Sequence, residues 1–331
     1  MKKAVFLGDR GNISRVYEKT ADKLAAELEF IEPMFDRANL QKRASETQDV
    51  SYIFSTWGMW QLTEAEIKEY FPSLKAVFYA AGSVKGFAGE FLSAGVQVYS
   101  AWAANGIPVA QFTAAEIMLA LKGFYSSVHN GGGEWANHGG ARDFPGIMDA
   151  KVGLIGAGMI GRLVAGELSK LPIELLIYDK FADAEKIAAL GGRKASLCEI
   201  FAECDVISNH LANVPETVGM LDYELFSRMK AHAVFINTGR GAQVKRDDLV
   251  RALTEVKTRT ALLDVTDPDE PPSPGNPLLT MENVFLTPHI AGSMGNEIHR
   301  MAEFMYEEYI LLSRGLPTRY EVTPEMLVTM A

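Results

Sequence analysis

Three segments of the chain combine side chains that could bind an anion and move a proton. Each follows an apolar run, and they read Asn-Thr-Gly-Arg240-Gly, Leu-Asp264-Val-Thr-Asp-Pro-Asp269-Glu270 and Thr-Pro-His289-Ile-Ala-Gly-Ser. Arg240 stands between glycines, so its guanidinium could hold a carboxylate in a bidentate fork. The imidazole of His289 could take a proton from a hydroxyl and return it to a carbonyl. The alternative is structural: an arginine that ties two loops and a histidine that caps or packs.

An acidic partner would favour the chemical role of His289. Asp269 or Glu270 could hold its second ring N–H, fix the tautomer and favour the protonated form. Otherwise both acids belong to a solvated, proline-rich loop.

A glycine pattern elsewhere in the chain predicts a dinucleotide-binding turn. Gly156, Gly158 and Gly161 join the apolar run 151–155 to a helical pattern, and Asp179 ends the next apolar run. The first glycine makes the tight turn, the second lets the backbone approach a pyrophosphate, and the third lets helix and strand pack closely. The carboxylate of Asp179 would accept from ribose hydroxyls and repel a 2′-phosphate, which favours NAD over NADP. A glycine turn used only for packing is the alternative.

Composition narrows the class of protein. The 331 residues are 48% hydrophobic and 22% charged, which is typical of a globular α/β enzyme with more than one domain. A net charge of −10 disfavours nucleic acid and anionic membranes as partners, and no apolar run is long enough to span a bilayer. The spacing of Cys198 and Cys204 matches no metal or redox motif, so we expect no metal site and a reducing cytoplasm.

Two series of strands and helices place these segments. The first has strand-like runs at 4–7, 52–55, 76–80 and 96–99 and a helical pattern at 16–28. The second has runs at 152–155, 174–178, 205–208, 233–236, 260–264 and 284–286. We predict an α/β protein with two doubly wound parallel-sheet domains: a Rossmann domain at 104–290, inserted into a flavodoxin-like substrate domain formed by 1–103 and 291–331. A helical pattern at 293–313 returns the chain to the substrate domain. A small substrate should bind in the cleft between the domains, with hinges near 102–106 and 288–292.

Aromatic residues could shape the substrate site. The loop Ser55-Thr-Trp57-Gly-Met-Trp60-Gln follows a strand and contains no Lys or Arg, which suggests a wall against an uncharged substrate tail. The alternative is that both tryptophans pin the loop to its own domain. Lys85 could add a second positive charge, and the glycine-rich stretch ending at Trp135 is interpreted as a surface loop.

Over nearly its whole length the chain resembles the D-isomer-specific 2-hydroxyacid dehydrogenase family. The matching segments are those with the glycine turn and Asp179, the three reactive segments, Tyr79-Ala-Ala-Gly-Ser-Val-Lys-Gly86 and Asn105-Gly-Ile-Pro-Val-Ala-Gln-Phe-Thr113. The resemblance implies His289 as general acid/base, Arg240 as binder of the substrate carboxylate and carbonyl, and Asp264 near the nicotinamide. The predicted cofactor-binding residues are Gly156, Gly158, Met159, Ile160, Gly161, Asp179, His210, Thr238, Gly239, Arg240, Asp264, His289 and Gly292. The predicted substrate-binding residues are Trp57, Ala81, Gly82, Ser83, Arg240 and His289.

One departure from the family concerns the acid that pairs with His289. The family's glutamate lies five residues after the aspartate of the Leu-Asp-Val turn, and that position here is Asp269. By this register we assign Asp269 as the catalytic partner, although a loop one residue longer would give the role to Glu270. His210 lies in a segment that lines the cofactor in the family, and we interpret it as structural or adenosine-side.

The resemblance thus implies an NAD-dependent oxidoreductase that acts on a small 2-oxo or 2-hydroxy acid. It also implies a homodimer, which the region 105–150 could form. One alternative is an NAD(H)-sensing interaction protein on the same fold, and another is a family member that acts on a different small anion, such as formate or phosphite.

Overall fold

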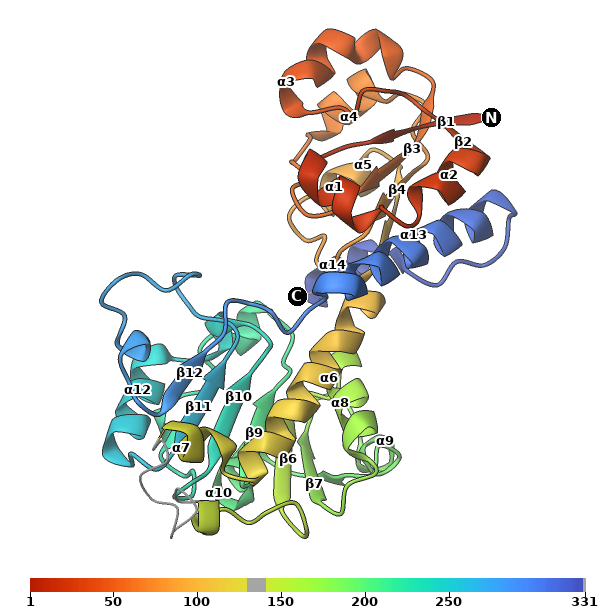
Figure 1. The fold of residues 1–331 in the computed structure, drawn as a ribbon. Coiled ribbons are helices and arrows are strands. Elements are labelled where there is room, and N and C mark those ends of the chain that lie inside the picture. Colours follow the sequence, from red (N-terminus) through yellow and green to blue (C-terminus); the bar gives the residue numbers. More distant parts are fainter. Residues whose placement is uncertain (130–140, 330–331) are drawn as a thin grey trace. The chain divides into compact units, whose positions relative to one another are not determined.

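The computed structural model describes residues 1–129 and 141–329, which form two compact units. The first unit comprises Met1–Gly106 and Ser293–Ala331, and the second comprises Ile107–Gly292. Each has its own sheet, as Figure 1 shows, and all strand pairs are parallel except one at the edge of the first sheet, so the α/β prediction is confirmed. The domain boundaries were expected after residues 103 and 290, and the two units divide after residues 106 and 292.

The sheet of the first unit has the strand order β13-β5-β4-β3-β1-β2, and only β13 is antiparallel to its neighbour. Without β13, this is the flavodoxin-like order. The strands are β1 (Lys2–Phe6), β2 (Leu28–Phe30), β3 (Val50–Ser55), β4 (Ala76–Tyr79), β5 (Gln97–Ser100) and β13 (Glu321–Val322).

Helices cover both faces of this sheet, and each face has its own apolar cluster. One face is covered by α1 (Arg10–Val16), α2 (Ala21–Glu27) and α13 (Ile298–Ser313). The other is covered by α3 (Arg37–Leu40), α4 (Glu64–Tyr70) and α5 (Ala88–Ser93), with α14 (Pro324–Thr329) beside α5.

The helix predicted at 16–28 is confirmed only at Ala21–Glu27. The chain forms α1 and α2 with a turn between them, and then the short strand β2. Tyr17 explains the break, because its buried hydroxyl donates to the carbonyl oxygens of Ser55 at 3.0 Å and Phe78 at 3.3 Å. These long-range contacts fix the turn, although no glycine or proline marks it. The predicted helix at 293–313 begins later, at Ile298, after a 3₁₀ turn at Gly295–Glu297.

The sheet of the second unit is wholly parallel, in the order β12-β11-β10-β9-β6-β7-β8. This is the Rossmann order with a seventh strand added at one end. The strands are β6 (Lys151–Ile155), β7 (Glu174–Tyr178), β8 (Arg193–Lys194), β9 (Val206–Asn209), β10 (Val234–Asn237), β11 (Thr260–Leu263) and β12 (Val284–Leu286). Most are almost continuously buried, as expected of strands covered on both faces. The sequence predicted six of them and missed the two-residue β8.

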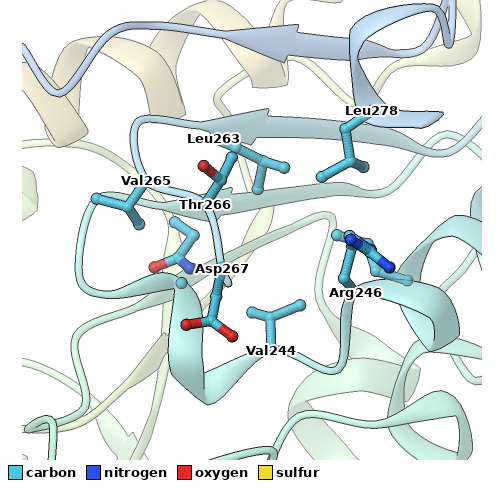
Figure 2. Close-up of a pocket in the computed structure, with 10 residues that line it drawn as sticks. Val244, Arg246, Leu263, Val265, Thr266, Asp267 and Leu278 are labelled. Carbon is cyan, nitrogen blue, oxygen red and sulfur yellow. The ribbon is translucent and has the colours of Figure 1, made fainter. Parts of the chain in front are cut away.

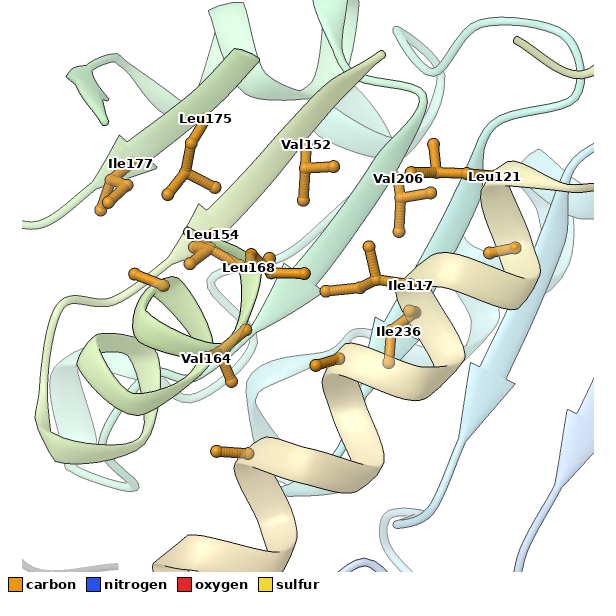
Figure 3. Close-up of a cluster of buried hydrophobic side chains, with 14 of the residues drawn as sticks. Ile117, Leu121, Val152, Leu154, Val164, Leu168, Leu175, Ile177, Val206 and Ile236 are labelled. Carbon is orange, nitrogen blue, oxygen red and sulfur yellow. The ribbon is translucent and has the colours of Figure 1, made fainter. Parts of the chain in front are cut away.

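Two groups of helices cover this sheet. Apolar side chains of α6 (Trp102–Leu121), α8 (Met159–Leu168) and α9 (Ala184–Ala188) pack on one face, where Figure 3 shows Ile117 and Leu121 of α6 close to Val206. Those of α10 (Leu197–Glu203), α11 (Tyr223–Phe226) and α12 (Arg246–Glu255) pack on the other. The helix α7 (Phe124–His129) follows α6, and short 3₁₀ turns lie at Gln41–Glu46, Pro215–Thr217, Gly241–Gln243 and Pro277–Leu279.

The segment Asn105-Gly-Ile-Pro108, which begins in the hinge expected near 102–106, is helical and lies inside α6. Buried Ala101, just before this helix, and Ala104 pack against the core of the first unit. The glycine-rich stretch ending at Trp135 lies outside the described residues. Across the described parts of the chain, no helix has both the length and the apolar character needed to cross a membrane.

Candidate active site

The glycine-rich turn joins β6 to α8 and leaves the start of the helix open. Gly156 has a φ of +101°, and a Cβ there would lie 2.7 Å from the carbonyl oxygen of His210. A Cβ at Gly161 would overlap the carbonyl oxygen of Gly156. A Cβ at Gly158, in contrast, would meet nothing within 4 Å, and no side chain caps the helix that begins at Met159. The turn therefore fits a pyrophosphate, as the predicted dinucleotide requires.

Asp179 follows β7 and is tied to this turn. One carboxylate oxygen accepts from Ala157 N at 2.8 Å, and the other accepts from Phe181 N at 2.8 Å and Ala182 N at 2.7 Å. Burial acts to raise the pKa of Asp179, but the three N–H groups outweigh it and hold the pKa below its usual value. A carboxylate has about four acceptor positions. One is thus left for a ribose hydroxyl.

His210 lies buried after β9, against the glycine-rich turn. Its Nε2 is 3.0 Å from Ser208 Oγ, and its Nδ1 has no partner among the described residues. Burial lowers the pKa of His210 to about 4. The ring is therefore neutral at neutral pH and unsuited to donate a proton there. Its backbone packs against Gly156, which supports the structural interpretation.

A network of buried amide side chains holds the loop that carries Arg240. Asn209 donates from Nδ2 to Asn237 Oδ1 at 3.1 Å and to Gln243 Oε1 at 2.7 Å. Asn237 in turn donates to the carbonyl oxygen of Arg240 at 3.0 Å and accepts from Gly239 N at 3.1 Å. All three amides are buried, so the network fixes the loop at the ends of β9 and β10. The sequence analysis singled out none of them; Asn209 and Asn237 each end an apolar run, whereas Gln243 lies in the turn that follows Arg240.

Arg240 presents most of its guanidinium to a ligand. Its Nη1 donates to Gly239 O at 2.8 Å, and its other N–H groups have no acceptor among the described residues. Burial lowers the pKa of Arg240, and the charge of Glu270 opposes that shift. An arginine in such surroundings remains charged. The arrangement suits a carboxylate ligand.

Asp264 ties the segment that carries His289 to the end of β11. Its Oδ1 accepts from Thr287 Oγ1 at 2.6 Å and Ile290 N at 2.8 Å, and its Oδ2 accepts from Ala291 N at 2.9 Å. His289 has a φ of +54°, in the left-handed region that few L residues adopt. Such a conformation costs on the order of 1 kcal/mol and persists where surrounding bonds fix it. Asp264 supplies those bonds on both sides of His289.

In the structure His289 is paired with Glu270 and not with Asp269, to which the family register gave this position. Nδ1 of His289 forms a hydrogen bond with Oε1 of Glu270. The backbone oxygen of Asp269 instead accepts from Thr266 Oγ1 at 2.5 Å, which closes a turn just before Glu270. The closed turn and the longer glutamate side chain together bring the carboxylate to the ring. Nε2 of His289 has no partner among the described residues and is available to a substrate.

Close packing of two loops brings Glu270 and Arg240 near each other. A Cβ at Gly241 would overlap the backbone of Thr266, so the loop after β11 rests directly on this glycine. Figure 2 shows Thr266 and Asp267 on that loop. The cavity beside them has a volume of about 20 Å³, room for roughly one water, and is not a substrate site.

The other predicted cofactor residues lie at the same carboxyl edge of the second sheet. Thr238 Oγ1 is 2.9 Å from Thr113 Oγ1 of α6, and both side chains are buried. Ile160 is half-buried and packs against the core, and Gly292 follows the anchored Ala291. Thr113 is a further contact that the sequence did not single out.

In the first unit, the candidate substrate loop follows β4. The hydroxyl of Ser100 contacts the carbonyl oxygens of Ala81 at 3.0 Å and Gly82 at 2.6 Å. The N–H groups of Gly82 and Ser83 have no acceptor within the described residues. Free backbone N–H groups in a turn can bind an anion.

The tryptophan loop of the first unit is anchored in its own core. Trp57 is half-buried against two apolar clusters, and its carbonyl oxygen accepts from Asn12 Nδ2 at 3.1 Å. Trp60 packs against one of those clusters. This packing supports the interpretation that the tryptophans pin the loop.

Comparison with known proteins places the second unit in one family. The model of the D-isomer specific 2-hydroxyacid dehydrogenase NAD binding domain matches residues 116–291. D-3-phosphoglycerate dehydrogenase of Archaeoglobus fulgidus is 31% identical over 69% of this chain and 43% of its own length. Human glyoxylate reductase/hydroxypyruvate reductase is 36% identical over 54% of each chain. The chain thus spans about half the length of the curated relatives that it matches.

Solved structures share the fold over almost the whole chain. D-mandelate dehydrogenase of Rhodotorula graminis has a TM-score of 0.80 at 22% identity and covers 97% of each chain. A D-isomer specific 2-hydroxyacid dehydrogenase of Lactobacillus delbrueckii ssp. bulgaricus, in an NAD-complexed form, has a TM-score of 0.79 at 20% identity and covers 97% of this chain and 100% of the other.

Proposed function

Because the chain belongs to the D-isomer specific 2-hydroxyacid dehydrogenase family, we propose that it is an NAD-dependent oxidoreductase that interconverts a small 2-oxo acid and the D-2-hydroxy acid. The observation that carries this proposal is the group of Arg240, Glu270 and His289 at the carboxyl edge of the NAD-binding sheet. It combines a cation for the carboxylate with a carboxylate-paired imidazole for proton transfer. When bound, the nicotinamide cofactor supplies or accepts the hydride.

Arg240 orients the substrate and stabilises negative charge. Its unpartnered N–H groups pair with the substrate carboxylate and with the carbonyl oxygen as that oxygen gains charge. The amide network around Asn237 fixes the loop before the substrate arrives, so little reorganisation is needed.

His289 moves the proton. In the direction of reduction, its Nε2 donates to the carbonyl oxygen, and in oxidation the same atom accepts the hydroxyl proton. Glu270 holds Nδ1, which fixes the tautomer and stabilises the protonated ring. Glu270 therefore takes the part that the register gave to Asp269.

The preference for NAD over NADP rests on Asp179, because its ionised carboxylate stands where a 2′-phosphate would be repelled. The free N–H groups of Gly82 and Ser83, next to Ala81, are the candidates for carboxylate binding in the first unit. Trp57 is only half-buried and is retained as a candidate substrate contact.

We also propose a homodimer and a cytoplasmic location. Leu119, Phe124 and Val128 are large apolar side chains exposed on α6 and α7, a surface that a second copy could cover. Cys198 is exposed and Cys204 buried, and both are free, which suits a reducing compartment.

The test is oxidation of NADH, followed by absorbance, against a panel of 2-oxo acids: glyoxylate, hydroxypyruvate, pyruvate, phenylpyruvate and branched-chain acids, with NADPH in parallel. Arg240→Ala should lose about 2 to 4 kcal/mol in kcat/KM, and Arg314→Ala, an exposed arginine, serves as the control. His289→Ala should lose turnover and still bind NADH. Tight NADH binding without turnover on any acid would refute the proposed activity and favour the sensor, and a fully active Arg240→Ala variant would remove that residue from the mechanism.

A further inference from the structure

Glu116 is a buried carboxyl on the side of α6 that faces the predicted cofactor residues. It lies three residues after Thr113, so the two side chains share one face of the helix. Thr113 contacts Thr238 at 2.9 Å, which fixes that face against the loop after β10. Glu116 is 9% exposed, and its Oε2 is buried without a hydrogen-bond partner among the described residues. A buried polar atom without a partner is costly, so this oxygen marks a site that something else completes.

Two titratable groups on neighbouring elements interact with Glu116. Asp264, after β11, adds a second negative charge near it, and the charge of Glu116 adds to burial in raising the pKa of Tyr125 of α7 to about 12. Burial, and then the charge of Asp264, raises the pKa of Glu116 to about 8. Asp264 uses both its oxygens to hold the segment around His289, and no hydrogen bond joins it to Glu116 among the described residues. The two carboxyls therefore interact through charge.

We propose that Glu116 is a titratable carboxyl that sets the relative affinity of the cofactor site for the oxidised and reduced dinucleotide. The oxidised nicotinamide ring carries a positive charge and the reduced ring carries none. An ionised Glu116 attracts only the oxidised ring, so NAD⁺ binding releases the Glu116 proton to solvent whereas NADH binding leaves it in place. The inference rests on the proposed function, because it needs the nicotinamide near Thr238 and Asp264.

The consequence is a pH-dependent affinity ratio. As pH rises from about 6.5 to about 9, across the range in which Glu116 ionises, the Kd for NAD⁺ should fall relative to that for NADH by about fivefold, the low end of coupling between charged sites. Glu116→Gln keeps the shape of the side chain and removes the charge, so the ratio should become flat. Glu224→Gln, an exposed glutamate on α11, should follow the wild-type curve.

Isothermal titration calorimetry of both dinucleotides, without substrate, measures these affinities. The same titrations of wild-type protein, repeated in buffers of different ionisation enthalpy, give the number of protons released on binding. This measurement needs no variant, so it remains possible if Glu116→Gln does not fold. Proton release with NAD⁺ but not NADH is the expected result. Equal release with both, or a Glu116→Gln variant that keeps the wild-type pH dependence, would overturn the inference. Because no 2-oxo acid is present, these outcomes are independent of whether the panel shows turnover.

Discussion

Replacing Glu270 by Gln should lower kcat/KM for the 2-oxo acid about 5- to 30-fold. A hydrogen bond to a charged partner contributes about 1.5 to 3 kcal/mol. The His289 and Glu270 side chains are 48% and 39% exposed, so solvent screens their interaction, and about 1 to 2 kcal/mol is the appropriate range. Each 1.36 kcal/mol corresponds to about a tenfold change in rate, which gives the stated range.

Asp269→Asn is the matched control, because it removes one negative charge from the adjacent position. The hydrogen bond at Asp269 is made by its backbone oxygen, which accepts from Thr266 Oγ1 and is unchanged by this substitution. An exposed substitution of this kind changes free energies by about 0.5 kcal/mol or less, so kcat/KM should stay within about twofold of wild type.

Steady-state kinetics on the best acid of the panel would be combined with NADH titration and thermal unfolding for both variants. NADH affinity and Tm should be unchanged, because Glu270 acts through the orientation of His289. The reverse pattern, with Asp269→Asn impaired and Glu270→Gln normal, would refute the pairing seen here and restore the assignment by register.

Two further predictions concern stability. Burial lowers the pKa of His210 from 6.5 to about 4, so the neutral ring stabilises the fold above pH 6.5, and up to about 3 kcal/mol of unfolding free energy should be lost as pH falls toward 4. Urea unfolding of wild type and His210→Asn across this pH range measures the loss. The same dependence of unfolding free energy on pH in both proteins would contradict the assignment. Arg259→Leu should lower the unfolding free energy by about 2 to 4 kcal/mol, because buried Arg259 donates to the carbonyl oxygens of Ser227, Met229 and Ala252 and these lose their partner. Arg251→Leu removes the exposed pair with Glu255 and the contact of the guanidinium with the Tyr223 ring, and it should cost about 1 kcal/mol in the same denaturant experiment. Similar losses for both arginines would contradict the argument.

The glycine-rich turn shows why part of the site could be predicted from sequence. Gly156 and Gly161 are required by local geometry, a positive φ and a close backbone approach, and such requirements leave a readable spacing. The buried parallel strands are likewise apolar runs that end where Thr238, Asp264 and His289 follow. Local rules therefore locate both the turn and the carboxyl edge.

The pairing of Glu270 shows where such rules stop. A register transferred from a family fixes a position along the chain, but the direction of a side chain depends on the turn that precedes it. Here the hydroxyl of Thr266 and the absence of a side chain at Gly241 shape the loop, and both act through tertiary contacts. The same holds for Tyr17, whose distant bonds to Ser55 and Phe78 lie at the turn before α2, a turn that the apolar pattern at 16–28 did not predict.

Chemistry and positioning fall to different residues at this edge of the sheet. Arg240, Glu270 and His289 each leave polar atoms exposed to a ligand, while uncharged amides and Asp264 hold their loops from beneath. Because the exposed groups contribute little to the bonds that fix the backbone, removing one of them should impair turnover and leave folding intact. Removing one of the buried amides or Asp264 should instead lower folding stability, because their hydrogen-bond partners would be left unpaired in the interior. Glu116 differs from these supports, because it is buried and its Oε2 holds no other group in place. Burial opposes its ionisation, and the charge would act on a bound ligand and not on the fold.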